Sequence, residues 1–237
     1  MKDLKFLISL FILLLSAISS QAQRAEIQFT QNWEFTGGSV TGEEIHEIVD
    51  IPHTWNAKDA QEGIPYFRGE GVYTKSFTPD IAWKNQRLFI RFEGVMTIAQ
   101  VYLNDELLGE HRGGYSAFIF ELTDKIIFGQ ENTVKVIADN SYSLEVLPLF
   151  GDFNIYGGIY RPVNLLVTPQ VCISPLDFAS PGIYLQQTRV TKESATVDAK
   201  VLISNATSES QNITVSATLM DATGNSLETL QKDISAK

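Results

Sequence analysis

The chain has 237 residues, of which 44% are hydrophobic, so it is long enough for one large or two modest domains with a buried core. Its formal net charge of −10 comes from carboxylates scattered along the sequence, and no basic cluster of the kind that binds nucleic-acid phosphates interrupts them. The single cysteine, Cys172, excludes an intramolecular disulfide. These features indicate a globular protein that binds no nucleic acid.

The first residues have the pattern of a secretory signal peptide. Lys2 and Lys5 precede an apolar run over residues 6–17, and the small residues that end at Ala22 suit a signal peptidase. We expect residues 1–22 to be a signal peptide and the mature protein to be secreted or periplasmic. No later stretch is apolar over the roughly 18 residues that a membrane-spanning helix needs, so we expect no membrane association after cleavage.

The following residues have the pattern of short strands separated by turns. Alternation over residues 88–93 predicts a strand with apolar side chains on both faces. Residues 97–111 have the pattern of a hairpin, whose turn pair Asn104 and Asp105 tolerates left-handed backbone angles. Because turn signals recur about every eight to twelve residues, we predict an all-β sandwich or jelly roll over residues 24–172.

A stretch rich in proline, serine and glycine, residues 174–182, predicts a domain boundary. Up to four strands are predicted after it, over residues 182–190, 195–204, 212–220 and 226–234. An immunoglobulin-like sandwich takes about seven strands and about 100 residues. We therefore predict an incomplete immunoglobulin-like β-sandwich over residues 178–237, with an unpaired edge and an uncovered apolar face.

The stretch from Gly151 to Arg161 combines an acid, an amide, two adjacent glycines and aromatic side chains. Such residues can form a wall of a sugar site, because a sugar presents flat C–H faces and a rim of hydroxyls. A tight turn that leads into a buried strand explains the same residues. The residue types alone leave both interpretations open.

Six short motifs, taken together and in this order, resemble those of glycoside hydrolase family 2. They occupy residues 50–55, 71–77, 88–95, 101–109, 114–118 and 158–161. The resemblance covers about residues 30–170 as the N-terminal, galactose-binding-like jelly-roll β-sandwich of the family, followed by the start of its immunoglobulin-like domain. It implies the sugar-binding portion of a β-galactosidase-like enzyme that hydrolyses O-glycosyl bonds, with a β-galactoside or related glycan as ligand.

The resemblance also implies substrate-binding residues. Asp152 stands where β-galactosidases of the family offer an aspartate to sugar hydroxyls, and capping of its own turn is an equally weighted alternative. Asn154 and Tyr156 of the same loop are weaker candidates. Arg68 and Tyr66, in a segment where the family approaches the mouth of its active site, complete the predicted set.

In the family both catalytic glutamates lie on a barrel that follows the immunoglobulin-like domain. The resemblance therefore implies no catalytic residue in this sequence, no activity of this chain alone, and the barrel of a full-length enzyme as partner. Acidic pairs such as Glu43-Glu44 lie in polar stretches without the apolar cover that raises a carboxyl pKa. A stand-alone, non-catalytic carbohydrate-binding module and a structural or assembly domain are the alternatives.

Several reactive side chains have structural explanations. The three histidines are widely separated, which excludes a zinc spacing, and no cofactor motif is present, so we expect neither metal nor cofactor. We expect His53 to be packed in the structure or to cap a turn rather than to bind a ligand. Arg161 and Glu93 are predicted to form an ion pair, because a guanidinium on an apolar strand needs its donors met.

Overall fold

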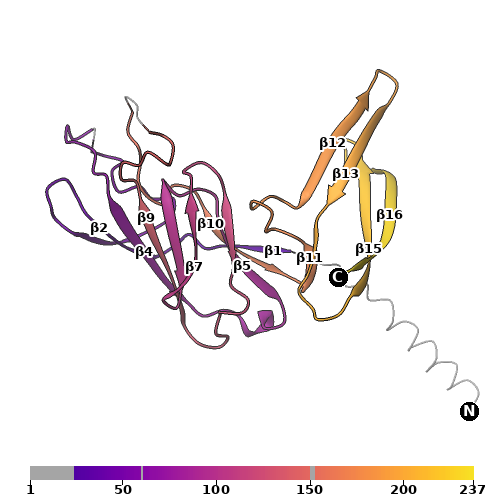
Figure 1. Ribbon diagram of the computed structural model, residues 1–237, viewed down its shortest axis with the longest axis horizontal. Helices are drawn as coiled ribbons and strands as arrows, with labels where there is room; N and C mark the ends of the chain where they lie inside the picture. The colour runs from indigo at the N-terminus through magenta and orange to yellow at the C-terminus, as the bar shows by residue number, and fades with distance from the viewer. Residues whose placement is uncertain (1–23, 60, 150–152) are drawn as a thin grey trace, which may run out of the picture.

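The computed structural model describes residues 24–59, 61–149 and 153–237. Within them the chain forms a two-sheet sandwich followed by a set of hairpins (Figure 1). A single 3-10 turn, η1 (Ile81–Trp83), accompanies the strands, and the described residues contain no α-helix. The predicted all-β class is confirmed. Among these described residues, no helix is long and apolar enough to cross a membrane.

Both sheets of the sandwich are antiparallel. The smaller sheet has the strand order β1-β10-β5-β8. Its strands are β1 (Ala25–Gln28), β5 (Arg87–Phe92), β8 (Phe118–Glu121) and β10 (Val163–Thr168). The larger sheet has the order β3-β2-β4-β9-β6-β7. Its strands are β2 (Trp33–Gly37), β3 (Ile45–Val49), β4 (Glu70–Phe77), β6 (Ile98–Leu103), β7 (Glu106–Arg112) and β9 (Asn132–Asp139).

The core lies between the inner faces of these sheets. Along β9 buried and half-buried residues alternate strictly, and Val134, Val136 and Ala138 belong to the core cluster. This is the period of two expected of a strand with one face on a core. In β5, Phe89 points away from that cluster and is still fully buried. The prediction of apolar character on both faces of this strand is confirmed.

The predicted hairpin is formed by β6 and β7. Its turn residues Asn104 and Asp105 have φ angles of 51° and 64°, in the left-handed region that asparagine and aspartate tolerate better than most residues. The Asn104 side chain also donates to Asn132 Oδ1 at 2.9 Å and accepts from the Thr133 amide at 2.9 Å. The turn is therefore fixed to the neighbouring strand as well as by its own backbone.

After the sandwich the strands pair as two-stranded antiparallel ribbons, β11-β14, β12-β13 and β15-β16. Their bounds are β11 (Val171–Ile173), β12 (Ile183–Val190), β13 (Ala195–Val201), β14 (Ile203–Asn205), β15 (Gln211–Met220) and β16 (Ser226–Ala236). The strand predicted over residues 195–204 is divided at Leu202. There the chain changes partner, because the Leu202 amide donates to Gly182 and its carbonyl accepts from Ser174.

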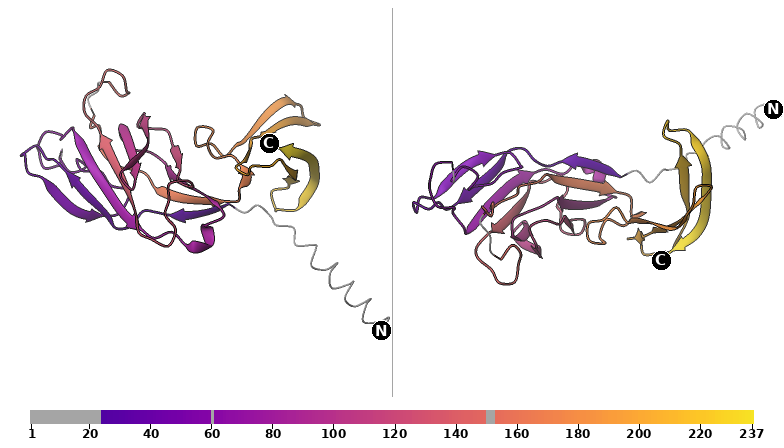
Figure 2. Two further views of the ribbon diagram at one scale, coloured as in Figure 1. Left: turned by 60° about the horizontal axis from the view of Figure 1, so that its bottom comes forward. Right: turned by 90° about the horizontal axis from the view of Figure 1, so that it is seen from above.

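The hairpins β12-β13 and β15-β16 lie beyond one end of the sandwich (Figure 2). Almost all of their residues are exposed. Large apolar side chains are among them, including Leu185, Val190, Leu227 and Leu230. These hairpins therefore have the uncovered apolar surface that the sequence predicts for an incomplete sandwich.

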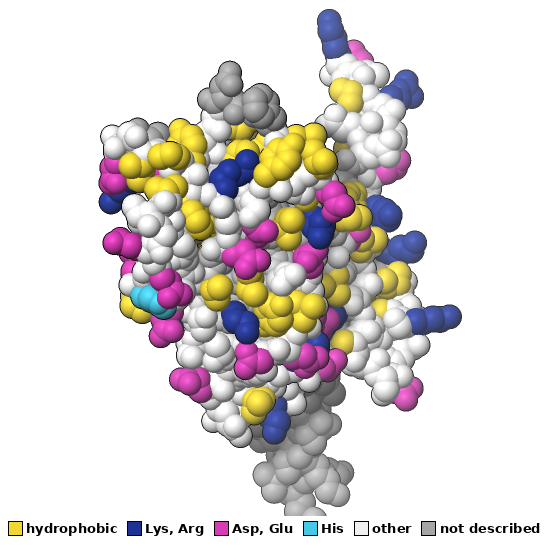
Figure 3. All heavy atoms as spheres, turned by 60° about the vertical axis from the view of Figure 1, so that its left-hand side comes forward, with side chains coloured by type: hydrophobic (Ala, Val, Ile, Leu, Met, Phe, Trp, Pro, Cys, Tyr) yellow, Lys and Arg dark blue, Asp and Glu magenta, His cyan; other side chains and the backbone are white. Residues whose placement is uncertain are grey.

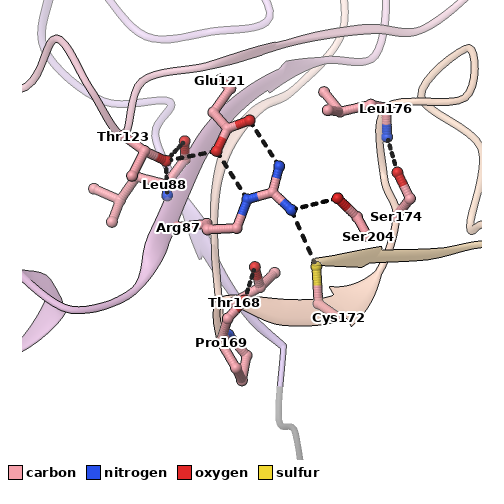
Figure 4. Close-up of polar contacts among 10 residues, drawn as sticks. All are labelled: Arg87, Leu88, Glu121, Thr123, Thr168, Pro169, Cys172, Ser174, Leu176 and Ser204. Atoms are coloured by element: carbon pink, nitrogen blue, oxygen red, sulfur yellow. Dashed lines mark hydrogen bonds and ion pairs between the residues drawn. The ribbon is translucent and has the colours of Figure 1, made fainter. Parts of the chain in front are cut away.

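A buried arginine connects the sandwich to these ribbons (Figure 4). Arg87, only 3% exposed, donates from Nε and Nη2 to the carboxylate of Glu121 at 2.8 and 2.7 Å. Its Nη1 donates to Ser204 Oγ of β14 at 2.7 Å, beside the buried Cys172. Burial raises the pKa of Glu121, but hydrogen bonds from Arg87 and Thr123 outweigh it, so the pKa of that carboxyl is lowered.

We expect the substitution Arg87→Met to lower the free energy of unfolding by about 3 kcal/mol, because it leaves a half-buried carboxylate without its partner. The control is Arg112→Met. Arg112 pairs with Glu110 and Glu145 at the surface, so its loss should leave the urea midpoint nearly unchanged. Urea unfolding followed by tryptophan fluorescence measures both. Equal urea midpoints for the two variants would contradict a stabilising role of the buried Arg87 hydrogen bonds.

Candidate functional site

Two long loops meet at one end of the sandwich. One, residues 50–69, connects β3 to β4, and the other, residues 140–162, connects β9 to β10. Backbone hydrogen bonds join them: the His53 amide donates to Ile159 at 2.9 Å and the Trp55 amide to Gly157 at 3.3 Å. Segments about 100 residues apart in sequence therefore lie side by side. We call this region the loop end.

The adjacent glycines of the second loop are required by protein packing. A Cβ on Gly157 would lie 2.0 Å from Cζ2 of Trp55, whose ring stacks on Phe35 at a centroid distance of 5.9 Å. Gly158 has a φ of +125°, and a Cβ there would lie 2.4 Å from Tyr73 Oη. These glycines make room for Trp55 and Tyr73, which explains their small size without a ligand.

His53 has the packed role that the sequence predicts. Its Nδ1 is 2.8 Å from Tyr73 Oη, and its ring lies 4.8 Å from that of Phe35. Burial lowers the pKa of His53, and the carboxylate of Glu47, 3.5 Å from Nε2, opposes that effect only in part. Burial also raises the pKa of Tyr73. Both side chains are therefore neutral near pH 7 and support the base of the loops.

The structure describes four of the five predicted site residues, and Asp152 lies outside the described residues. Tyr66 and Tyr156 are exposed, at 39% and 46%. Arg68 and Asn154 are half-buried. All four belong to the loop end, so the fold brings together two segments that the resemblance predicted separately. Their role in binding a ligand stays a prediction.

The loop end contains two residues that the sequence analysis missed. Asn56 and Asn140 are fully buried polar side chains, each with hydrogen-bond partners in both loops. Their local signal is weak, since Asn56 only follows Trp55 and Asn140 only follows a strand.

The Trp55 ring itself contributes by packing. Its Nε1 is buried and has no hydrogen-bond partner among the described residues. Because the ring lies between Phe35 and Gly157, it fills the space at the base of both loops. It therefore supports the loop end from below.

The predicted ion pair between Arg161 and Glu93 is wrong. The carboxylate of Glu93 pairs with Arg91, with Nε 2.6 Å from Oε1, because those two side chains lie two residues apart on one face of the chain. Arg161 instead donates to the backbone carbonyls of Tyr115 and Glu93, at 3.2 and 3.4 Å. Its guanidinium lies 5.1 Å from the ring centroid of Tyr160.

Hydrophobic side chains gather at the upper end of one face of the molecule, with a basic side chain among them (Figure 3). The exposed aromatic and apolar side chains of the second loop are Tyr142, Leu144, Leu147, Leu149, Phe153 and Tyr156. Tyr66 adds an exposed ring from the first loop. Within the described ranges, no three His, Cys, Asp or Glu side chains are grouped as metal ligands. The predicted site residues described here offer two exposed rings, Tyr66 and Tyr156, with the Asn154 amide and the Arg68 guanidinium beside them.

We expect the substitution Gly158→Ala to lower the free energy of unfolding by about 3 kcal/mol, from backbone strain together with the clash against Tyr73. Gly129→Ala is the matched control, since Gly129 has a φ of +74° but nothing within 4 Å of the added Cβ. Gly129→Ala should lower the free energy of unfolding by the backbone strain alone, about 1 kcal/mol. Urea unfolding separates the two, and a loss no larger for Gly158→Ala would contradict the packing described.

The chain is similar in sequence to a known protein family and to characterised enzymes. A family model described as glycosyl hydrolases family 2, sugar binding domain, matches residues 19–169. The β-glucuronidase of Bacteroides fragilis is 52% identical over 203 residues, which are 85% of this chain and 29% of that protein. The β-galactosidase of Thermoanaerobacter pseudethanolicus is 36% identical over 142 residues, 56% of this chain and 18% of that protein.

Among solved structures, that of Bacteroides uniformis β-glucuronidase 2 superposes with a TM-score of 0.84 at 30% identity, over 91% of this chain and 26% of that one. This chain therefore spans less than a third of the length of these relatives. The match to the family model extends over more than half of the sequence. The chain thus belongs to glycoside hydrolase family 2, and it carries the sugar-binding domain of that family.

Proposed function

We propose that the loop end is the carbohydrate-binding surface of a family 2 β-glycosidase. One observation carries the proposal: a shared hydrogen-bond network places the Tyr66–Arg68 and Asn154–Tyr156 segments together at one end of the sandwich. Exposed tyrosine rings can stack on the C–H face of a pyranose. Half-buried amide and guanidinium groups beside them can donate to its hydroxyls.

A β-glucuronide is the proposed sugar class. The relative that is 52% identical is a β-glucuronidase, and the solved relative from B. uniformis is covalently bound to cyclophellitol-6-carboxylate aziridine, which carries a carboxylate. The Arg68 guanidinium could form a charge-assisted bond with a sugar carboxylate. The β-galactoside expected from the sequence has weaker support, since the β-galactosidase relative is 36% identical.

In this proposal the present residues bind and orient, and they do not cleave. Hydrolysis by this class of enzyme needs two carboxyl groups across the scissile bond, one as nucleophile and one as acid/base. We propose that both come from another part of a longer enzyme, for which the loop end holds the sugar ring. The chain alone is then expected to leave nitrophenyl glycosides intact. From residues 1–22 we also infer that the protein is exported.

Isothermal titration calorimetry with methyl β-D-glucuronide and methyl β-D-galactoside tests this function. The chain should bind the glucuronide more tightly. The substitution Arg68→Met should weaken glucuronide binding about tenfold, the value of one lost charge-assisted hydrogen bond, and change galactoside binding less than about twofold. Arg189→Met, an exposed arginine of β12, is the control and should change neither.

Two results would count against the proposal. If the chain bound neither glycoside, the structural or assembly role would be favoured over sugar binding. If Arg68→Met weakened both glycosides equally, the loop end would bind sugars without selecting the carboxylate.

A further inference from the structure

Asn56 uses its whole side chain to join the two loops. Its Nδ2 donates to the carbonyls of Phe67 and Ile155, both at 3.1 Å, and lies 3.3 Å from Asn154 Oδ1. Its Oδ1 accepts from the Gly157 amide at 3.0 Å. The first partner belongs to the first loop and the others to the second. One fully buried amide therefore fixes the spacing between them.

Asn56 and Asn154 each donate a hydrogen bond to the other. While Asn56 donates to the Asn154 side chain, Asn154 Nδ2 donates to the Asn56 carbonyl at 3.1 Å. The Asn154 side chain is half-buried, so part of it faces solvent. Its orientation is thus set by a residue about 100 positions earlier in the chain.

Asn140 bonds the segment that carries Arg68, through both its backbone and its side chain. Its backbone carbonyl accepts from Arg68 Nε at 2.8 Å, and its Oδ1 accepts from the Gly69 amide at 2.9 Å. Its Nδ2 donates to Ile155 at 2.7 Å, the carbonyl that Asn56 also contacts. Asn140 is fully buried. The two buried side chains therefore converge on the Ile155 carbonyl. The Asn56 side chain bonds Asn154 directly, and the Asn140 side chain holds the Gly69 amide, next to Arg68.

We propose that Asn56 and Asn140 are positioning residues for saccharide binding, an inference that rests on the proposed function. Neither is exposed, so neither touches a sugar. Asn56 acts through Asn154, and the Asn140 side chain acts through the backbone at Gly69, which places Arg68. The donor atoms of Arg68 and Asn154 must be held to within a fraction of an ångström for a hydroxyl or carboxylate to meet both. Loss of either amide should release the paired loop segments and weaken sugar binding.

The chain offers a matched control for a merely structural role. Asn132 is also fully buried and also makes four side-chain hydrogen bonds, to Ile127, Gln130 and Asn104. It lies at the first residue of β9, whereas Asn140 directly follows the last residue of that strand. The two asparagines are therefore at opposite ends of the sandwich, and only one end carries the candidate site.

The experiment compares Asn56→Ala, Asn140→Ala and Asn132→Ala in the full chain. Calorimetry with methyl β-D-glucuronide and methyl β-D-galactoside gives the affinities, and urea unfolding gives the stabilities. All three variants should unfold at lower urea concentration than the wild type. Binding of the glycoside that the wild type prefers should fall about tenfold or more for Asn56→Ala and Asn140→Ala, and less than about twofold for Asn132→Ala.

Hydrogen exchange of single amides adds a readout that needs no sugar. The Gly157 amide should lose protection selectively in Asn56→Ala, and the Gly69 amide in Asn140→Ala, because each loses its acceptor. If Asn56→Ala does not fold, Asn140→Ala decides, since it removes fewer side-chain bonds.

The outcomes separate this inference from the function beneath it. A wild type that binds neither glycoside contradicts the proposed function, and the positioning role fails with it. A wild type that binds, with affinities in Asn56→Ala and Asn140→Ala no lower than in Asn132→Ala, overturns the positioning role alone. Weakened binding that parallels the selective loss of amide protection supports it.

Discussion

The loop end depends on one constraint: a buried backbone group needs a hydrogen-bond partner, and a loop has no neighbouring strand to supply one. In the sheets, buried backbone groups find these partners on the neighbouring strands. Where the chain leaves them, the amides of Asn56 and Asn140 substitute for the missing strand and satisfy carbonyls and amides of both loops. The surface that results is held by buried side chains rather than by sheet pairing.

The same constraint explains the residues that surround these asparagines. A loop fixed by side-chain amides can approach a neighbouring ring closely only where it has no Cβ, which is why Gly157 lies against Trp55. On the smaller sheet a different buried group, Arg87, joins the sandwich to β14. Each of these polar groups has hydrogen-bond partners on both segments that it joins, and each therefore favours one arrangement of them.

The sequence predicted features that depend on neighbouring residues. Alternation predicted the strand that became β5, and the Asn104-Asp105 pair predicted the turn between β6 and β7. Ordered motifs predicted the family. These succeed because the period of a strand and the backbone angles of a turn are set by residues close together in the chain.

Partners chosen across the fold could not be predicted in this way. Asn56 meets residues 98 and 101 positions away, and nothing near it in sequence indicates them. The ion pair of Glu93 was assigned to Arg161, whereas Arg91 lies closer on the same strand face. The division of the strand predicted over residues 195–204 likewise follows from its long-range partners, Gly182 and Ser174.

The central claim, that the loop end binds a sugar, is tested most directly by mapping the backbone amides of the labelled chain by NMR during titration with methyl β-D-glucuronide. The account predicts saturable shifts confined to residues 66–69 and 153–157, with the β15-β16 hairpin unchanged. Shifts confined to that hairpin, or no shift at a saturating concentration of the glycoside, would contradict it.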